Sequence, residues 1–267
     1  MNQAASSKTV KAPLTLRPRI SKPNRSLERG IEILRAFRAG SALLGNGEIS
    51  EKTGLSRSTV SRLTQTLVAS GMLQIEPGTR VYRLAPLVLS LGHAMRTGSR
   101  VSTLAAPLMR SAAEKHKINV GLASPDQTDM VYIESIRYNR RLSLRTVVSG
   151  QRIPMELTSL GRAYLAIVPA QQKQKLFERF KQIRTAQWPH LLNEIKQAEK
   201  HMKEHGYCHA SWQPEVLALT KPIELGAQIY VLNVSVSSDE DTSGLIQKLA
   251  PVLIQLHAEI EDALLHG

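Results

Sequence analysis

The stretch GLSRSTVSRLTQTLVASG, residues 54–71, decides the fold of the N-terminal part of this chain. Leu55, Ser56 and Val60 form the pattern of a serine N-cap closed by a hydrophobic staple, so a helix is expected after Ser56. At about 100° per residue, one face of this helix is apolar and consists of Val60, Leu63, Thr64 and Leu67. The opposite face carries the hydrogen-bonding side chains Arg57, Ser58, Ser61, Arg62 and Gln65. Such a face is often only solvated, but Arg pairs well with guanine and Gln with adenine, which suits a DNA major groove.

The flanking residues predict a winged helix-turn-helix. A first helix over residues 26–39 is expected to begin at the cap Ser26, and its apolar positions at helical spacing are Leu27, Ile31, Leu34 and Phe37. A short helix over 48–53 ends at Gly54, where glycine permits the positive φ that lets two helices meet sharply. Strands over 72–75 and 81–84 flank a turn at 76–79. Arg80 and Arg83 then lie on the wing, where phosphate contacts are expected.

The charge of the chain is concentrated at the same end. The formal net charge is +13 and the pI is about 10.1. Residues 1–25 hold six basic and no acidic side chains, and residues 26–98 hold nine basic and five acidic ones. Ten of the thirteen net positive charges therefore precede residue 99, which is the electrostatic pattern of a DNA-binding module joined to a nearly balanced second part.

Residues 1–25 are expected to form a disordered basic arm. Pro13, Pro18 and Pro23 interrupt any helix, and the arm either touches phosphates or stays solvated. It has no apolar core of a secretory signal, and no run approaches the roughly 18 apolar residues of a membrane span. We therefore expect no membrane partner. The single cysteine, Cys208, excludes an internal disulfide and fits a cytoplasmic location.

The chain changes character after the wing. Residues 84–95 are apolar and are expected to be helical after Pro86, and residues 101–117 are expected to form another helix after a break at 96–100. Exposed apolar positions such as Leu87, Val88 and Leu91 need a partner. Because helix-turn-helix proteins usually read paired half-sites, a homodimer is expected.

From residue 118 onward the pattern mixes strands and helices. Strands are expected over 119–123, 130–136, 142–148, 217–223 and 229–237, and helices over 159–167, 171–180, 189–205 and 242–265. This order predicts an α+β protein with one sheet and helices packed against it. A small ligand can bind over such a sheet, among a few polar groups in an apolar pocket.

Two stretches raise the question of catalysis. HMKEH at 201–205 has the H-x-x-E-H spacing of an inverted zinc-protease motif. It lacks a clear third ligand, however, and histidines in a last helical turn before Gly206 are explained by the helix dipole. Cys208 beside His209 could suggest a thiol nucleophile, but neighbouring strand residues point to opposite faces. The sequence predicts no enzyme, no metal and no cofactor; the alternative is a metabolite-binding or metal-dependent hydrolytic protein with an incidental basic arm.

Several separate segments together resemble the isocitrate-lyase-regulator (IclR) type of bacterial transcription factor. They are SLERGIEILRAF (26–37), TGLSRSTVSRLTQTLVASGML (53–73), YRLAPLVLSLG (82–92), GQRIPMELTSLGRAYLA (150–166), HGYCHASWQPEVLALTKPI (205–223) and VLNVSVSS (231–238). The resemblance implies a winged helix-turn-helix, a helical linker and a GAF/profilin-like effector domain. It also implies dimers or tetramers that bind operator DNA and respond to a small carboxylic or aromatic acid.

In that family the effector lies between the concave face of the sheet and a loop that corresponds here to Thr158, Ser159, Leu160 and Gly161. Backbone N–H groups at the start of the following helix can hold a carboxylate. The matching strand positions are Asn233 and Ser235, which alternate with apolar neighbours and so share one face. The family usually carries an acidic residue after the segment that matches 206–207, and here Ser211 stands nearest that place.

These observations predict a sequence-specific regulator in four parts: a basic arm (1–25), a winged helix-turn-helix (26–85), a linker helix (86–100) and an effector-binding, oligomerising domain (101–267). The residues expected to contact DNA are Arg57, Ser58, Thr59, Ser61, Arg62, Gln65, Arg80 and Arg83. The residues expected to contact the effector are Thr158, Ser159, Leu160, Gly161, Ser211, Asn233 and Ser235.

Overall fold

The computed structural model describes residues 23–138, 148–213, 216–238 and 240–266, and the chain divides into two compact units. The first unit ends at Leu84, and the second comprises Arg38–Gly40 and the chain from Ala85 onward. Nearly all of the expected arm and of the strand expected over 142–148 lies outside the described residues.

The first unit is a winged helix-turn-helix, as predicted. Its helices are α1 (Arg25–Ala36), α2 (Asn46–Thr53) and α3 (Arg57–Ala69). Its small antiparallel sheet has the order β1-β3-β2, with β1 (Leu44–Gly45), β2 (Leu73–Ile75) and β3 (Val81–Leu84). The sequence did not predict β1, which has only two residues. One apolar cluster holds the unit together, made of Ile33, Phe37, Leu44, Ile49, Val60, Leu63 and Leu73.

Helix α1 departs from the prediction in its cap and in its buried face. Its N-cap is Asn24 rather than Ser26, because the Asn24 side chain accepts hydrogen bonds from the backbone N–H groups of Ser26 and Leu27 at 3.0 and 3.2 Å. Ile33 is buried, whereas Leu27 and Ile31 are exposed. The helix has apolar residues on two faces, and the core of this unit covers only one of them.

The turn before α3 follows the prediction closely. Gly54 has a φ of +70° and ends α2, and Ser56 caps α3 by accepting the N–H of Thr59 at 3.3 Å. The Thr64 hydroxyl is fully buried and donates to the Val60 carbonyl at 2.9 Å. Helix α2 starts two residues earlier than expected, since Glu48 accepts the Gly45 N–H at 2.8 Å. The N-terminus of α3 is thus fixed by local contacts.

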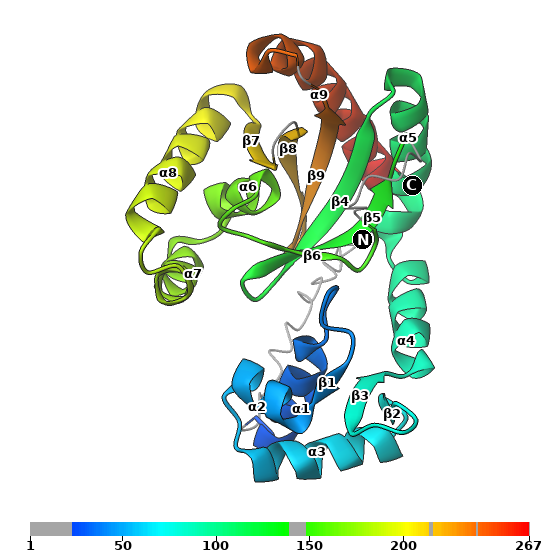
Figure 1. The fold of residues 1–267 in the computed structure, drawn as a ribbon. Helices are drawn as coiled ribbons and strands as arrows, with labels where there is room; N and C mark the ends of the chain where they lie inside the picture. The colour runs from blue at the N-terminus through cyan, green and yellow to red at the C-terminus, as the bar shows by residue number, and fades with distance from the viewer. Residues whose placement is uncertain (1–22, 139–147, 214–215, 239, 267) are drawn as a thin grey trace, which may run out of the picture. The chain divides into compact units, whose positions relative to one another are not determined.

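The second unit is built on a six-stranded antiparallel sheet of order β6-β5-β4-β9-β8-β7 (Figure 1). Its strands are β4 (Asn119–Asp126), β5 (Asp129–Ile136), β6 (Arg152–Pro154), β7 (Cys208–Gln213), β8 (Val216–Leu225) and β9 (Gln228–Ser237). The two outermost strands, β6 and β7, are not among the five strands predicted from the sequence, although Cys208 and His209 of β7 are treated there as strand residues. Single-sheet α+β architecture was predicted correctly.

Helices cover both faces of this sheet (Figure 1). On one face lie α5 (Arg100–His116) and α9 (Thr242–His266), and on the other lies α6 (Ser159–Ile167). Helix α8 (Trp188–His205) packs on α6 and β7, and α7 (Ala170–Ile183) precedes it. The side chains of β9 point alternately to the two faces of the sheet. Leu232 and Val234 belong to the apolar core under α5 and α9, and Val231 belongs to the core under α6.

Helix α4 (Pro86–Thr97) buries none of its own residues in the described chain. Leu89 is 79% exposed, and Leu87, Leu91 and Met95 are exposed as well. No helix of the described residues is long and apolar enough to cross a membrane.

One charged pair ties α4 to the sheet. The guanidinium of Arg96 donates three hydrogen bonds to the carboxylate of Glu134 on β5, at 2.9, 3.0 and 3.1 Å. The Glu134 side chain is nearly buried, whereas that of Arg96 is half-exposed. The end of α4 is therefore held by a two-pronged ion pair.

Candidate functional site

The polar face of α3 is available for contact. Arg57, Ser58, Arg62 and Gln65 are exposed, and Ser61 is half-buried. Among the described residues neither Arg57 nor Arg62 takes part in an ion pair. Two arginines and a glutamine therefore stand on one helix face with their hydrogen-bonding groups uncommitted to charged neighbours.

The hydroxyl groups at the start of α3 serve the helix cap. Ser56 Oγ lies 3.2 Å from Ser58 Oγ and 2.9 Å from Thr59 Oγ1. Of the expected DNA contacts, Ser58 and Thr59 are thus already engaged locally, and a base or phosphate would compete with the cap.

The wing presents its two arginines differently. Arg80 is exposed at the end of the β2–β3 turn. Arg83 Nε lies 3.3 Å from Glu76 Oε2, so a phosphate would have to replace that carboxylate. Of the two expected phosphate contacts, Arg80 is thus the one without a competing carboxylate among the described residues.

The start of α6 is clamped from several sides. Thr158 caps the helix: its Oγ1 accepts the Gly161 N–H at 3.3 Å and donates to the Pro154 carbonyl at 2.9 Å. The buried Thr220 hydroxyl on β8 donates to the Ser159 carbonyl at 3.0 Å. Gly161 packs so closely that a Cβ there would lie 1.9 Å from the Met155 carbonyl oxygen.

A cavity of about 90 Å³ lies between the start of α6 and the sheet. It brings together five of the seven residues expected to bind an effector, namely Thr158, Ser159, Leu160, Asn233 and Ser235. The other two lie elsewhere: Gly161 packs on Met155, and Ser211 is exposed on β7.

Sequence reasoning missed half of this lining, namely Tyr132, Ile153, Ala210, Val216 and Ala218. Alternation along a strand indicates which residues share a face, but only the pairing of strands distant in sequence indicates which faces meet. All ten lining side chains are uncharged at neutral pH. A charged ligand in this cavity would therefore have to be stabilised by hydrogen bonds from backbone groups.

Asn233 is the most constrained polar group of this cavity. It is only 4% exposed, and its Oδ1 has no hydrogen-bond partner among the described residues. Gly121 lies against it, since a Cβ at that glycine would be 2.3 Å from Asn233 Oδ1 and 2.5 Å from Tyr132 Cε1. Burial raises the pKa of Tyr132, so its phenol stays neutral.

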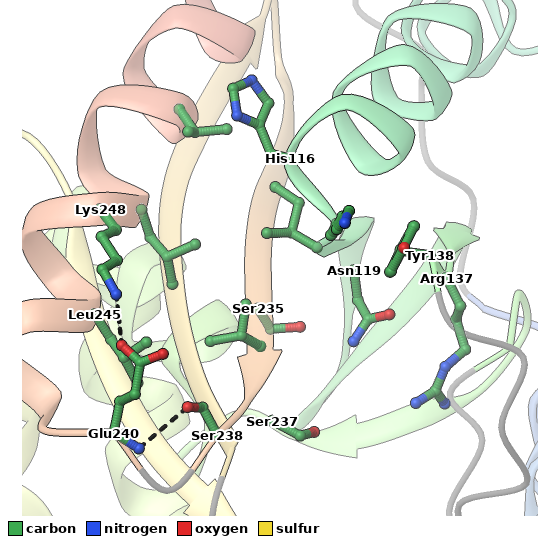
Figure 2. A pocket seen from close by; sticks show the side chains of 15 residues that line it. His116, Asn119, Arg137, Tyr138, Ser235, Ser237, Ser238, Glu240, Leu245 and Lys248 are labelled. Atoms are coloured by element: carbon green, nitrogen blue, oxygen red, sulfur yellow. Dashed lines mark hydrogen bonds and ion pairs between the residues drawn. The ribbon is translucent and has the colours of Figure 1, made fainter.

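A second cavity, of about 560 Å³, lies where β4 begins and β5 and β9 end, beside α9 (Figure 2). Figure 2 shows Glu240 paired with Lys248 of α9, and the Glu240 N–H donating to Ser238 Oγ at 3.1 Å. Ser235 lines both cavities, whereas Asn233 lines only the smaller one.

The HMKEH motif forms the last turn of α8, and its two histidine rings lie close to each other and to the ring of His209. His201 Nδ1 lies 2.8 Å from the Tyr207 carbonyl oxygen, and the His201 ring is 4.3 Å from that of His205 and 4.9 Å from that of His209. In the part of the chain that the structure describes, no three His, Cys, Asp or Glu side chains are placed to hold a metal ion.

Cys208, the residue before His209, is fully buried. Burial raises the pKa of its thiol to about 12, and the sulfur lies against Thr220 Oγ1 and the Ser159 carbonyl. The thiol is therefore protonated at neutral pH and poorly suited to be a nucleophile.

Comparison with known proteins identifies the family. Residues 26–77 match the IclR helix-turn-helix domain, and residues 93–218 match the bacterial transcriptional regulator IclR C-terminal domain. The chain is 33% identical over 186 residues to the HTH-type transcriptional regulator TsaQ1/TsaQ2 of Comamonas testosteroni. That match covers 68% of this chain and 66% of the relative, just under two thirds of its length.

Two solved structures share the fold. An IclR family transcriptional regulator from Brucella abortus is 30% identical with a TM-score of 0.82, and the match covers 91% of this chain and 93% of that one. An IclR homolog from Microbacterium hydrocarbonoxydans, complexed with 4-hydroxybenzoate, is 16% identical with a TM-score of 0.63 over 89% of this chain and 99% of that one. The chain thus belongs to the IclR family of bacterial transcriptional regulators.

Proposed function

We propose that this regulator reads an operator through α3 and the wing, and that a small organic acid modulates its affinity for that DNA. The observation that carries the DNA-reading part is the exposed face of Arg57, Arg62 and Gln65 on a helix whose start is locally fixed. Arg and Gln side chains can each make two hydrogen bonds to one base in the major groove. Arg80 adds a phosphate contact that orients the unit.

The effector belongs in the smaller cavity under α6. A helix start leaves its first N–H groups without intrahelical partners, and here Thr158 takes only that of Gly161. The N–H groups of Ser159 and Leu160 are then left for an anion, which the helix dipole favours. The 4-hydroxybenzoate in the Microbacterium homolog is an acid of this kind.

We further propose that the protein works as a homodimer or homotetramer in the cytoplasm and has no catalytic activity. Helix α4 leaves several apolar side chains exposed among the described residues, and their contact with a second subunit would bury them. An acid that binds one conformation better shifts the population of dimers toward it, so acid and operator alter each other's affinity by the same factor.

Operator binding by the full-length protein tests this function. Genomic fragments bound by the protein would supply a labelled operator, and its affinity would be measured by fluorescence anisotropy at fixed salt with and without a panel of carboxylic acids. Sequence-specific binding that some acid changes is the expected result. Equal affinity for operator and scrambled DNA would refute the DNA-reading part, and an operator affinity that no acid alters would refute the effector part.

A further inference from the structure

The larger cavity of the second unit differs in chemistry from the one under α6. It lies between the end of α5, the first turns of α9, the start of β4 and the end of β9 (Figure 2). Three of its lining side chains, Lys117, Arg137 and Lys248, are cationic at neutral pH, and Glu240 is anionic. The smaller cavity is lined by uncharged side chains, and no residue of α6 lines the larger one. A ligand of the larger cavity would therefore meet a net positive charge on side chains.

One wall of the larger cavity is apolar. Leu245 and Leu249 of α9 and Ile118, directly before β4, are buried in the core under α5 and α9 and also line the cavity. Val236 and Val252 extend this wall and are only partly buried. The volume of about 560 Å³ falls within the range of roughly 300–1,000 Å³ that is usual for small-molecule sites. Apolar surface beside cationic groups suits a ligand with an anionic group and an apolar body.

Lys117 is the cation most available to such a ligand. It is exposed and forms no ion pair with any described residue, whereas Lys248 is paired with Glu240. Lys117 ends α5 with a φ of +56°, at a position where glycine is the common residue. The helix dipole favours a cation near this end, but Lys115 and His116 in the last turn already supply that. An anion in the cavity gives the lysine at position 117 a role of its own.

Uncommitted hydrogen-bonding groups lie across the cavity from α9. The side chains of Asn119 and Ser237 line the cavity and make no hydrogen bond to any described residue. Figure 2 shows Asn119 on the β4 side and the pair of Glu240 and Lys248 on the α9 side. Polar groups that fix the orientation of a ligand are usual in a largely apolar site.

We propose that the larger cavity is a second ligand site, separate from the one proposed under α6, and that it binds an amphipathic organic anion. The anionic group lies at Lys117, and the apolar body lies against Leu245 and Leu249. This site does not rest on the effector site under α6, because the charged residues and the apolar wall that form it do not line the smaller cavity. Either site can fail its test while the other stands.

Matched probes separate the contribution of charge from that of apolar contact. Isothermal titration of the full-length protein would compare octanoate and octyl phosphate with the neutral octanamide and with inorganic phosphate. At least one of the two octyl anions is expected to bind ten-fold or more tightly than octanamide and inorganic phosphate, and the tighter of the two distinguishes a carboxylate ligand from a phosphate ligand. Equal affinities for octanamide and the octyl anions, or no binding of either octyl anion, would overturn the proposal.

Variants of α5 place the bound anion. Lys117→Gln removes one charge at the cavity and is expected to weaken the octyl anions five-fold or more without changing the affinity for octanamide. Lys115→Gln, at an exposed position of α5 that does not line the cavity, is the matched control and should leave every affinity unchanged. Equal losses in both variants would mean that only net charge matters. No loss in Lys117→Gln would mean that the anion binds elsewhere, including under α6, and either result would overturn the proposal.

Lys117→Gly separates ligand binding from the stability of the helix end. Glycine adopts a φ of +56° without strain, so the melting temperature of the protein without ligand should not fall. The affinity for the octyl anions should nevertheless fall as it does in Lys117→Gln. Undiminished affinity in Lys117→Gly would show that the lysine serves no ligand, and would overturn the proposal.

Discussion

The Arg96–Glu134 pair, which holds the end of α4 to β5, allows a quantitative prediction. We would replace Glu134 by Gln, Arg96 by Met, and both together. The Glu134 side chain is 10% exposed and that of Arg96 is 47% exposed, so the pair is screened on one side only. Three charge-assisted hydrogen bonds would be worth several kcal/mol if fully buried, and solvent at Arg96 reduces the expected coupling to about 1–2 kcal/mol.

The assay is a double-mutant cycle in urea and heat. Both tryptophans, Trp188 and Trp212, lie in the second unit, so their fluorescence reports on the unit that contains the pair. Glu134→Gln alone should lower the melting temperature by about 2–8 °C, since about 1 kcal/mol corresponds to 2–4 °C in a unit of this size. Glu178→Gln, an exposed position on α7, is the matched control and should change little.

A small coupling would refute the reasoning. Distant, independent substitutions add to within about 0.3–0.5 kcal/mol. If the coupling between Arg96→Met and Glu134→Gln falls within that range, the pair is solvent-screened and does not fix α4. The same variants also test whether the proposed effector site is coupled to α4, because Tyr132, which lines the smaller cavity, lies two residues from Glu134 on β5. Glu134→Gln should then reduce the effect of the acid on operator affinity without changing the affinity for the acid.

Four further changes have defined outcomes. Arg62→Ala should weaken operator binding at fixed salt by about 1–3 kcal/mol, or 5- to 150-fold, if Arg62 reads a base; unchanged anisotropy titrations would remove it from that role. Gly54→Ala should destabilise the first unit by about 1–2 kcal/mol through backbone strain alone, because φ is +70° at this position and a Cβ would meet no neighbour. Gly54→Asn should cost less, since asparagine tolerates a positive φ better, and urea unfolding followed by circular dichroism compares the two variants. The pKa of His209 is lowered by burial and then by neighbouring positive groups, so its contribution to stability is complete above about pH 6.5 and is lost as pH falls below that value; His209→Gln should therefore show a smaller drop in melting temperature from pH 7.5 to 5.5. Cys208 should resist a thiol reagent at pH 8 in the folded protein and react at once in denaturant, and rapid labelling of the folded protein would contradict its burial.

Local chemistry explains why α3 could be predicted from sequence. The Ser56 cap, the positive φ of Gly54 and the buried stripe under α3 depend on residues within a few positions of one another. Helix α1 was harder because Leu27 and Ile31 compete with Ile33 for the core, and sequence spacing does not say which face a neighbouring helix covers. The short strands β1 and β6 exist through pairing with distant segments and leave almost no periodic signal.

The cavity shows the same division between local and long-range information. Asn233 and Ser235 follow from alternation along one strand, and they do line the cavity. Tyr132 could not be placed there from sequence, because that requires the pairing of β4 with both β5 and β9. Ser211 was expected from a family position alone, and the structure leaves it exposed on β7.

The close contact of Gly161 with Met155 has a mechanical consequence. With no space for even a methyl group between them, the first turn of α6 cannot move toward the backbone behind it. This wall of the cavity cannot retreat to make room, so space for a larger guest has to come from the strand side chains opposite. Variants that reshape the proposed effector site should therefore change Tyr132, Ile153 or Ala218 and leave position 161 untouched.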